Sequence, residues 1–226
     1  MKITFLGHAS LLIETKGTRI VVDPFITPNP KAANIDIESL RPDVLLLTHA
    51  HGDHVADVET LAAGKEVLIV SNFEITTYFG QKNCKGHGMN IGGKFTFDWG
   101  TVKMVNALHS SAFPDGTYGG NPAGFVLWNE EGCVYIAGDT ALTKDMELIA
   151  ESCPSLDLAI LPIGDNFTMG YEDAVHASDY VGCDRVLGYH FDTFEVIAID
   201  KAKAKEVFGS AGKELALLDI GESLEV

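Results

Sequence analysis

Histidine and aspartate side chains are concentrated in one short segment, THAHGDH, at residues 48–54. It holds His49, His51, Asp53 and His54, directly after an apolar run of valine and leucine. In an extended turn, residues two apart can point to the same side, so His49 and His51 could bind one ion, and Asp53 and His54 could reach a second. Imidazole and carboxylate groups suit Zn²⁺ and similar borderline cations. The segment therefore predicts a metal site.

Three more potential metal ligands follow apolar runs elsewhere in the chain. His109 comes after VKMVNAL, Asp139 after CVYIAG and His190 after RVLGY. Each run is typical of a β-strand, and a stiff sheet fixes the position of a residue in the loop that follows a strand. The recurrence of this placement favours metal binding over a chance cluster on a solvated turn.

The elements that must position these residues are short strands and helices. Many β-like runs are nearly all apolar, as expected for strands that are covered on both faces. Asn72 and Asp200 could act as helix N-caps. The pattern predicts the α/β (or α+β) class, with sheets packed between helices. Helical spacing of apolar residues is found at 54–63, 72–81, 142–152, 171–181 and 200–208.

Length and composition fit a globular protein with a substantial core. The 226 residues suit one domain over 1–226, and 46% of them are apolar while 21% are charged. The formal net charge of -16 argues against long nucleic acids as substrates, because a surface that binds them needs clustered Lys and Arg. A small ligand held at a local positive site remains compatible with this charge.

The sequence contains no signal of export or of a membrane span. The N-terminus MKITFLGHAS has no apolar stretch long enough for a signal peptide, and no segment approaches the roughly 20 apolar residues of a span. The four cysteines form no CxxC pair, which argues against a zinc knuckle and a dithiol redox motif. We expect a cytoplasmic protein, whose oligomeric state the sequence does not indicate.

The segment THAHGDH resembles the His-x-His-x-Asp-His motif of the metallo-β-lactamase superfamily, and ALHSS, AGDTAL and GYHFDTF follow in the family order. The resemblance covers almost the whole chain and implies a four-layer αββα sandwich. Matched residue by residue, it implies that His49, His51 and His109 hold a first metal. It further implies that Asp53, His54 and His190 hold a second, with Asp139 bridging the two.

Within the superfamily, GHASLLIE, HSS, GDTAL and PIGDNFTMG resemble a branch of metal-dependent hydrolases near ascorbate-phosphate lactonase and N-acyl phosphatidylethanolamine phospholipase D. Two departures concern the shape of the pocket. Tyr171 stands where that branch often has proline, and GYHFDTF replaces a more usual Pro-x-His-Tyr-x-Thr-Phe.

The ligand set predicts a dinuclear hydrolase. Two divalent ions, most simply Zn²⁺ with Mn²⁺, Fe²⁺ or Ni²⁺ as alternatives, would supply a bridging hydroxide as nucleophile, oriented by Asp53 as the catalytic carboxylate. The expected substrate is a small, anionic ester, lactone or phosphodiester. One alternative is a phosphodiesterase for nucleotides or lipid headgroups. Another is a metal-binding sensor or scaffold without turnover.

Three further residues have both a functional and a structural interpretation. His8 lies in an expected hairpin turn that the resemblance places beside the metals, where it could contact substrate, although a histidine in a turn is often only a surface residue. Asp23 could orient a metal ligand or could merely start a turn before Pro24. Asn166 could donate to a substrate oxygen or belong to an ordinary GDN turn.

Overall fold

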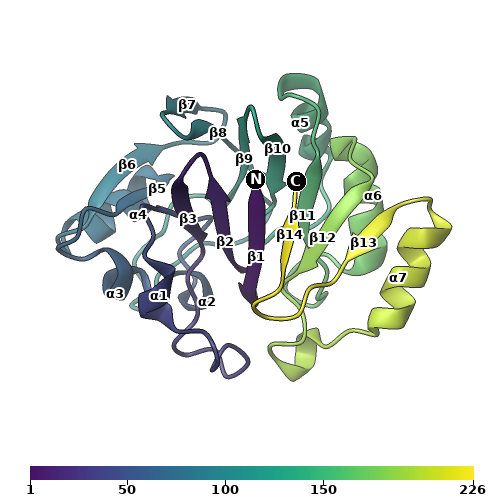
Figure 1. Ribbon diagram of the computed structural model, residues 1–226, viewed down its shortest axis with the longest axis horizontal. Coiled ribbons are helices and arrows are strands. Elements are labelled where there is room, and N and C mark those ends of the chain that lie inside the picture. The colour runs from purple at the N-terminus through teal and green to yellow at the C-terminus, as the bar shows by residue number, and fades with distance from the viewer.

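The chain forms two seven-stranded sheets in the computed structural model, which describes residues 1–226 (Figure 1). The first sheet has the order β14-β1-β2-β3-β4-β5-β6. Its C-terminal strand pairs antiparallel with its N-terminal strand, so the two chain ends lie side by side. The strands are β1 (Lys2–Gly7), β2 (Ser10–Thr15), β3 (Thr18–Val22), β4 (Val44–Leu46), β5 (Leu68–Asn72), β6 (Lys85–Met89) and β14 (Ser223–Glu225).

The second sheet has the order β13-β12-β11-β10-β9-β8-β7 and the same mixture of pairings as the first. In each sheet the first three pairings, counted from β14 or from β7, are antiparallel and the last three are parallel. The strands are β7 (Lys94–Phe97), β8 (Gly100–Asn106), β9 (Ala123–Asn129), β10 (Gly132–Ile136), β11 (Leu158–Pro162), β12 (Arg185–Tyr189) and β13 (Glu214–Ala216).

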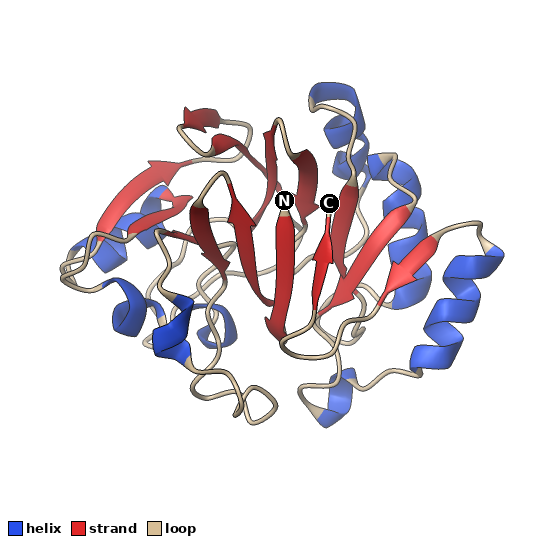
Figure 2. Ribbon diagram, viewed as in Figure 1, coloured by secondary structure: helices blue, strands red, loops and turns tan.

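The helices cover the outer faces of the two sheets (Figure 2). The chain has no helix with both the length and the apolar character needed to cross a bilayer. The helices are α1 (Ile37–Leu40), α2 (Gly52–Val55), α3 (Val58–Ala62), α4 (Phe73–Gly80), α5 (Glu147–Ser152), α6 (Tyr171–Val181) and α7 (Lys201–Ser210), with 3₁₀ turns η1 (Lys144–Met146) and η2 (Glu195–Ile197).

Three apolar clusters hold the layers together. The central cluster lies between the sheets and contains side chains of both, such as Ile13 and Ile160. A second joins α4 to the outer face of the first sheet, and a third joins α6 and α7 to the second sheet through residues such as Val181 and Phe208. Parallel strands such as β11 are buried throughout, which explains their unbroken apolar runs. The predicted four-layer arrangement is confirmed.

The predicted helix at 54–63 is two short helices instead of one. α2 ends at Val55 and α3 begins at Val58, and between them Asp57 leaves helical geometry. Its carboxylate accepts hydrogen bonds from the backbone amides of Ile26 and Thr27, at 2.6 and 2.9 Å. The break therefore anchors the loop that follows β3 to the segment carrying the histidine cluster. The N-caps Asn72 and Asp200 are confirmed, since each side chain accepts from the first turn of its helix.

Strand β6 (Lys85–Met89) has no apolar periodicity, and the sequence analysis did not predict it. Its glycines are required by the close approach of α4, because a Cβ on Gly88 would lie 2.9 Å from Thr76 Oγ1. The strand is held by its parallel pairing with β5. Tertiary packing, which leaves no trace in local composition, decides the structure of this segment.

Candidate metal centre

The seven predicted ligands meet where the carboxyl ends of the strands of both sheets face one another. The histidine cluster follows β4, while His109 follows β8, Asp139 follows β10 and His190 follows β12. Six of them, together with His8, fall into two groups in which the ligand atoms all lie within 4.8 Å of one another. One group is His49, His51 and His109, the other is His8, Asp53, His54 and His190, and a third such group, Asp23 with His49 and His54, links the two. His8 joins the second group from the turn between β1 and β2.

Asp139 lies between the two groups. Its Oδ2 is 3.1 Å from His190 Nε2, 3.4 Å from His54 Nε2, 3.6 Å from His109 Nε2 and 3.9 Å from His49 Nε2. The carboxylate is 3% exposed, so water cannot take the place of these neighbours. A single oxygen thus faces nitrogen atoms of both groups, the position that a ligand shared by two cations would occupy.

Several of these atoms lack hydrogen bonds although they are buried. Neither nitrogen of His190, nor His54 Nε2, nor Asp139 Oδ1 has a partner. An unsatisfied buried polar group costs about 1–3 kcal/mol, so such atoms rarely accumulate without a reason. Imidazole nitrogens and carboxylate oxygens that converge with free lone pairs are suited to a divalent cation such as Zn²⁺. The residues present fit a metal centre.

One buried carboxylate, Asp23, orients a histidine of each group. Its Oδ2 accepts from His54 Nδ1 at 2.9 Å and from the Thr48 hydroxyl at 2.6 Å. Since that hydroxyl donates to Asp23, Thr48 Oγ1 is left to accept from His49 Nδ1, 3.0 Å away. Both rings are then fixed with their Nδ1 protonated and their Nε2 turned toward Asp139, and His49 Nε2 also lies 3.0 Å from His51 Nδ1. Fixing the ring in this way is the usual role of a carboxylate behind a metal-binding histidine.

The charges of the site favour a cation. Burial lowers the pKa of His49 well below its ordinary value, which keeps this imidazole neutral. Burial alone would raise the pKa of Asp139, but His190 and His54 hold it well below the usual range. For His54, burial acts to lower the pKa, yet Asp139 and the carboxylate behind the ring raise it well above the ordinary value. The position therefore attracts positive charge, as a metal site must.

His8 is held by both halves of the chain. Its Nε2 lies 3.0 Å from Asp53 Oδ2 and its Nδ1 lies 2.9 Å from the hydroxyl of Thr193, while its backbone oxygen accepts from His190 N at 2.7 Å. Burial lowers the pKa of His8 to about 4, against the hydrogen bond to Asp53, which acts to raise it. The neutral ring then donates from Nε2 to Asp53 and accepts at Nδ1 from Thr193.

Several residues with strained backbone conformations lie in the candidate metal centre. Three residues with left-handed φ values are His8 (56°), Asp23 (43°) and His190 (56°), and none of them is glycine. Such conformations cost about 1–3 kcal/mol each and persist where the surroundings impose them, which is often at functional sites. The sequence analysis could not have found this strain, because histidine and aspartate carry no local signal for it.

Asn166 belongs to neither of the two ligand groups. It follows β11 beside Asp165, whose carboxylate accepts from the Asn166 backbone amide at 2.8 Å. Together with Tyr171 and Asp200 it lines a neighbouring pocket of about 480 Å³. The sequence analysis missed Thr48 and Thr193, although each lies within three residues of a histidine that it had singled out.

The comparisons with known proteins agree with this geometry. Residues 2–190 match a beta-lactamase superfamily domain. A metal-dependent hydrolase of the UPF0173 group from Flavobacterium johnsoniae is 61% identical over 226 residues and covers all of both chains. The metal-dependent hydrolase YtkL of the same group, from Bacillus subtilis, is 43% identical over 232 residues, again with full coverage of both chains.

Solved structures have the same fold. Igni18, a metallo hydrolase from the archaeon Ignicoccus hospitalis, superposes with a TM-score of 0.89 at 32% identity and covers 99% of this chain and 97% of its own. An isothiocyanate hydrolase from Delia radicum gut bacteria has a TM-score of 0.81 at 20% identity and covers 100% and 99% of the two chains. At that identity, the second likeness concerns the fold alone.

Proposed function

The chain belongs to the metal-dependent hydrolases of the beta-lactamase superfamily, and from that premise we propose that it uses two divalent cations to hydrolyse a small, anionic ester, lactone or phosphodiester. The observation that carries the dinuclear proposal is Asp139, whose Oδ2 faces histidines of both ligand groups within 3.9 Å. His49, His51 and His109 would hold one cation. Asp53, His54 and His190 would hold the other, with Asp139 between them.

When bound, the cations would activate water at neutral pH and polarise the oxygen of the scissile bond. The chain's own groups would position the reactants. Asp53 would orient the attacking water through its carboxylate, which is itself held by the His8 ring at 3.0 Å. Asp23 would keep His49 and His54 in the tautomer that leaves Nε2 available. No serine or cysteine nucleophile is needed for this chemistry.

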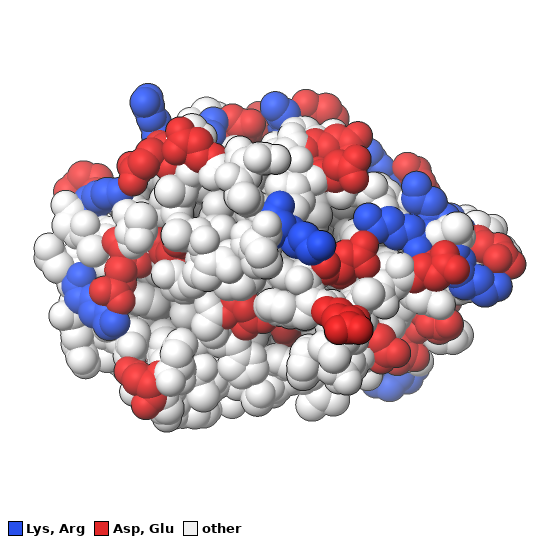
Figure 3. Space-filling model, turned by 90° about the horizontal axis from the view of Figure 1, so that it is seen from below, with Lys and Arg blue, Asp and Glu red and all other residues white.

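The outer surface supports a small substrate. No continuous band of Lys and Arg crosses the face at the carboxyl ends of the β1 and β12 strands, and acidic and basic side chains alternate there with neutral surface (Figure 3). A long polyanion would need such a band. Positive charge would come instead from the metal centre, which is local and suits a compact anion.

The test combines metal analysis with a substrate panel. Protein purified without chelator should contain about two metal ions per chain and should hydrolyse at least one member of a panel of lactones, phosphodiesters and acyl esters after reloading with Zn²⁺ or Mn²⁺. Asp139→Ala should lose metal and turnover, whereas His176→Ala, on the exposed face of α6, should change neither. One metal per chain would refute the dinuclear site, and two metals without turnover would favour a sensor.

A further inference from the structure

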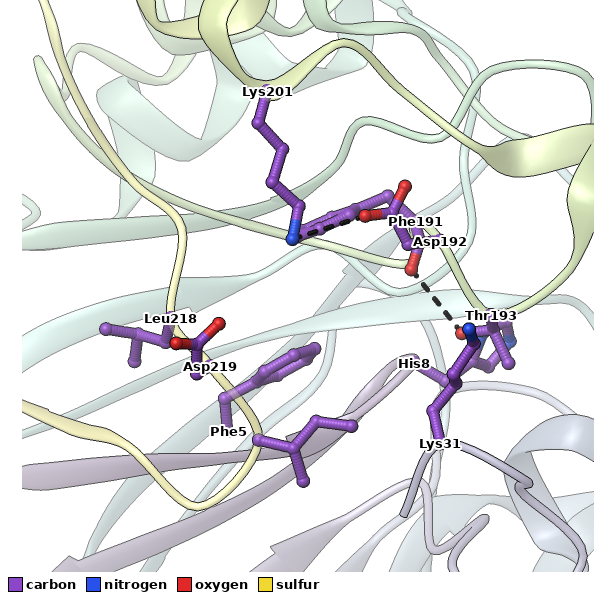
Figure 4. A pocket seen from close by; sticks show the side chains of 10 residues that line it. Phe5, His8, Lys31, Phe191, Asp192, Thr193, Lys201, Leu218 and Asp219 are labelled. Atoms are coloured by element: carbon purple, nitrogen blue, oxygen red, sulfur yellow. Dashed lines mark hydrogen bonds and ion pairs between the residues drawn. The ribbon is translucent and has the colours of Figure 1, made fainter.

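A pocket of about 320 Å³ adjoins the candidate metal centre on the other side of His8 (Figure 4). It is lined by the β1 strand with its following turn, by the loop after β3 that carries Lys31, by the segment after β12 with the start of α7, and by the segment that leads to β14. Its volume is within the range of small-molecule sites. Because His8 lines the pocket and also contacts Asp53 and His190, a ligand there would be one imidazole ring away from the proposed metal ligands.

The pocket has an apolar floor and charged residues above it. The rings of Phe5 and Phe191 stack with their centroids 6.4 Å apart, and Leu218 and Ile220 extend this surface. Such a floor can hold the carbon skeleton of a small organic molecule. Phe5 and Phe191 are themselves nearly buried, so the floor is rigid.

The two lysines of the pocket differ in their partners. Lys201 Nζ lies 3.2 Å from the carboxylate of Asp192 and 5.2 Å from the centre of the Phe191 ring, so its charge is already engaged. Lys31 Nζ has neither an ion pair nor a hydrogen bond, and Figure 4 shows it at the end of the pocket beside His8 and Thr193. Lys31 is therefore the free cation of this pocket.

The free carboxylate of the pocket lies at the other end. Asp219 forms no ion pair, and Figure 4 places it beside Leu218, across the apolar floor from the Lys31 ammonium. An anionic ligand group would be repelled at the Asp219 end and attracted at the Lys31 end. The pocket thus imposes one orientation, with the anionic group close to His8.

We propose that this pocket binds the non-reacting part of the substrate and that Lys31 recognises its anionic group, a carboxylate or a phosphate. The inference rests on the proposed hydrolase function and assigns to it a residue that determines specificity. The carbon skeleton would lie on Phe5 and Ile220. The scissile group would extend over the rim of the pocket, outside the buried His8 ring, toward the partly exposed Asp53.

The test compares two esters that differ only in charge, the monomethyl and the dimethyl ester of one dicarboxylic acid, or the corresponding pair for whichever ester class is hydrolysed. Lys31→Ala should lower kcat/KM for the anionic ester about 10-fold, mainly through KM, and leave the neutral ester within about 2-fold. Lys31→Arg should restore most of the preference. Lys203→Ala is the matched control, because Lys203 on α7 does not line the pocket and pairs with Glu206. An equal loss on both esters, or no loss, would overturn the proposal.

A binding measurement separates this proposal from the hydrolase function. Inorganic phosphate added to the zinc-loaded protein should shift the backbone amide resonances of Thr193 and Ile220, and Lys31→Ala should weaken that effect about 10-fold while Lys203→Ala leaves it unchanged. Shifts that depend on Lys31 in a protein without ester turnover would retain the pocket and reject the hydrolase. Shifts that survive in Lys31→Ala, or that are missing at both amides, would reject the pocket.

Discussion

At the residue scale, the most consequential contact is that of Asp23, which reaches a histidine of each ligand group. Asp23→Asn would replace an acceptor-only carboxylate by an amide, which cannot accept from both Thr48 and His54 in the same way. We expect metal affinity to fall about 10- to 100-fold at both sites. Titration with Zn²⁺ against a chromophoric chelator would measure this.

The control for Asp23→Asn is Asp157→Asn. Both carboxylates accept from a backbone amide at 2.8 Å, Asp23 from Thr48 and Asp157 from Cys133, but Asp157 lies at the amino end of β11, just before Leu158. It should retain the metal affinity of the wild type. Loss of affinity at only one site in Asp23→Asn would contradict the proposed link to His49 through Thr48.

A second prediction at this scale concerns Thr193. Thr193→Val keeps the side-chain shape and removes the hydroxyl that His8 Nδ1 contacts at 2.9 Å. The His8 ring would then lose the partner that fixes its tautomer, and Asp53 would be held less firmly. We expect kcat to fall about 10-fold with a smaller change in KM, and Thr193→Ser to retain activity. The ¹⁵N chemical shifts of the His8 ring should report the altered tautomer in Thr193→Val. An unchanged spectrum would refute the proposal that Thr193 fixes the His8 tautomer.

At the scale of elements, the predicted ligands lie where the sequence placed them because an unbroken apolar run marks a buried strand and therefore its end. That signal was sufficient to place His109, Asp139 and His190 after the ends of β8, β10 and β12, whereas metal binding by these residues stays a prediction. It could not indicate the contact of His8 with Thr193, since 185 residues separate the two and neither has a distinctive neighbourhood. It also failed at β6, whose glycines reflect the nearness of α4, and at Asp57, whose loop contacts divide the predicted helix.

Substitution of Gly164 would test how closely the loop after β11 must approach the loop after β12. A Cβ on this residue would lie 2.2 Å from the backbone oxygen of His190. Gly164→Ala should therefore displace the His190 loop, lower the free energy of unfolding by about 1–3 kcal/mol and reduce metal content. Gly209→Ala on α7 has no atom within 4 Å of the new Cβ and should be neutral or slightly stabilising. Chemical denaturation and metal analysis of both variants would decide. A Gly164→Ala variant with wild-type stability would contradict the close approach.

At the scale of the whole molecule, the proposed cations would join its two sheets. The THAHGDH segment follows a strand of the first sheet, whereas His109, Asp139 and His190 follow strands of the second. A cation that binds only the folded chain at 100 times its Kd stabilises it by about 2.7 kcal/mol per site. Because chelation would remove both cations, we expect it to lower Tm by about 10–20 °C. Because both sheets share the central cluster, calorimetry should still show one transition, as proposed for a single domain over 1–226. Two separate transitions would contradict that proposal.

The two sheets share the same order of antiparallel and parallel strand pairings, and this match suggests an evolutionary origin for the fold. Aligning β1 with β8 and β3 with β10 places His8 opposite His109, and Asp23 opposite Asp139, at equivalent strand ends. Duplication and fusion of one ancestral half-chain would produce this pattern, with its edge strand now supplied from the far end of the chain as β14. In that history, the two copies of one His and Asp pair diverged: Asp139 now faces both ligand groups, whereas Asp23 lies behind His49 and His54.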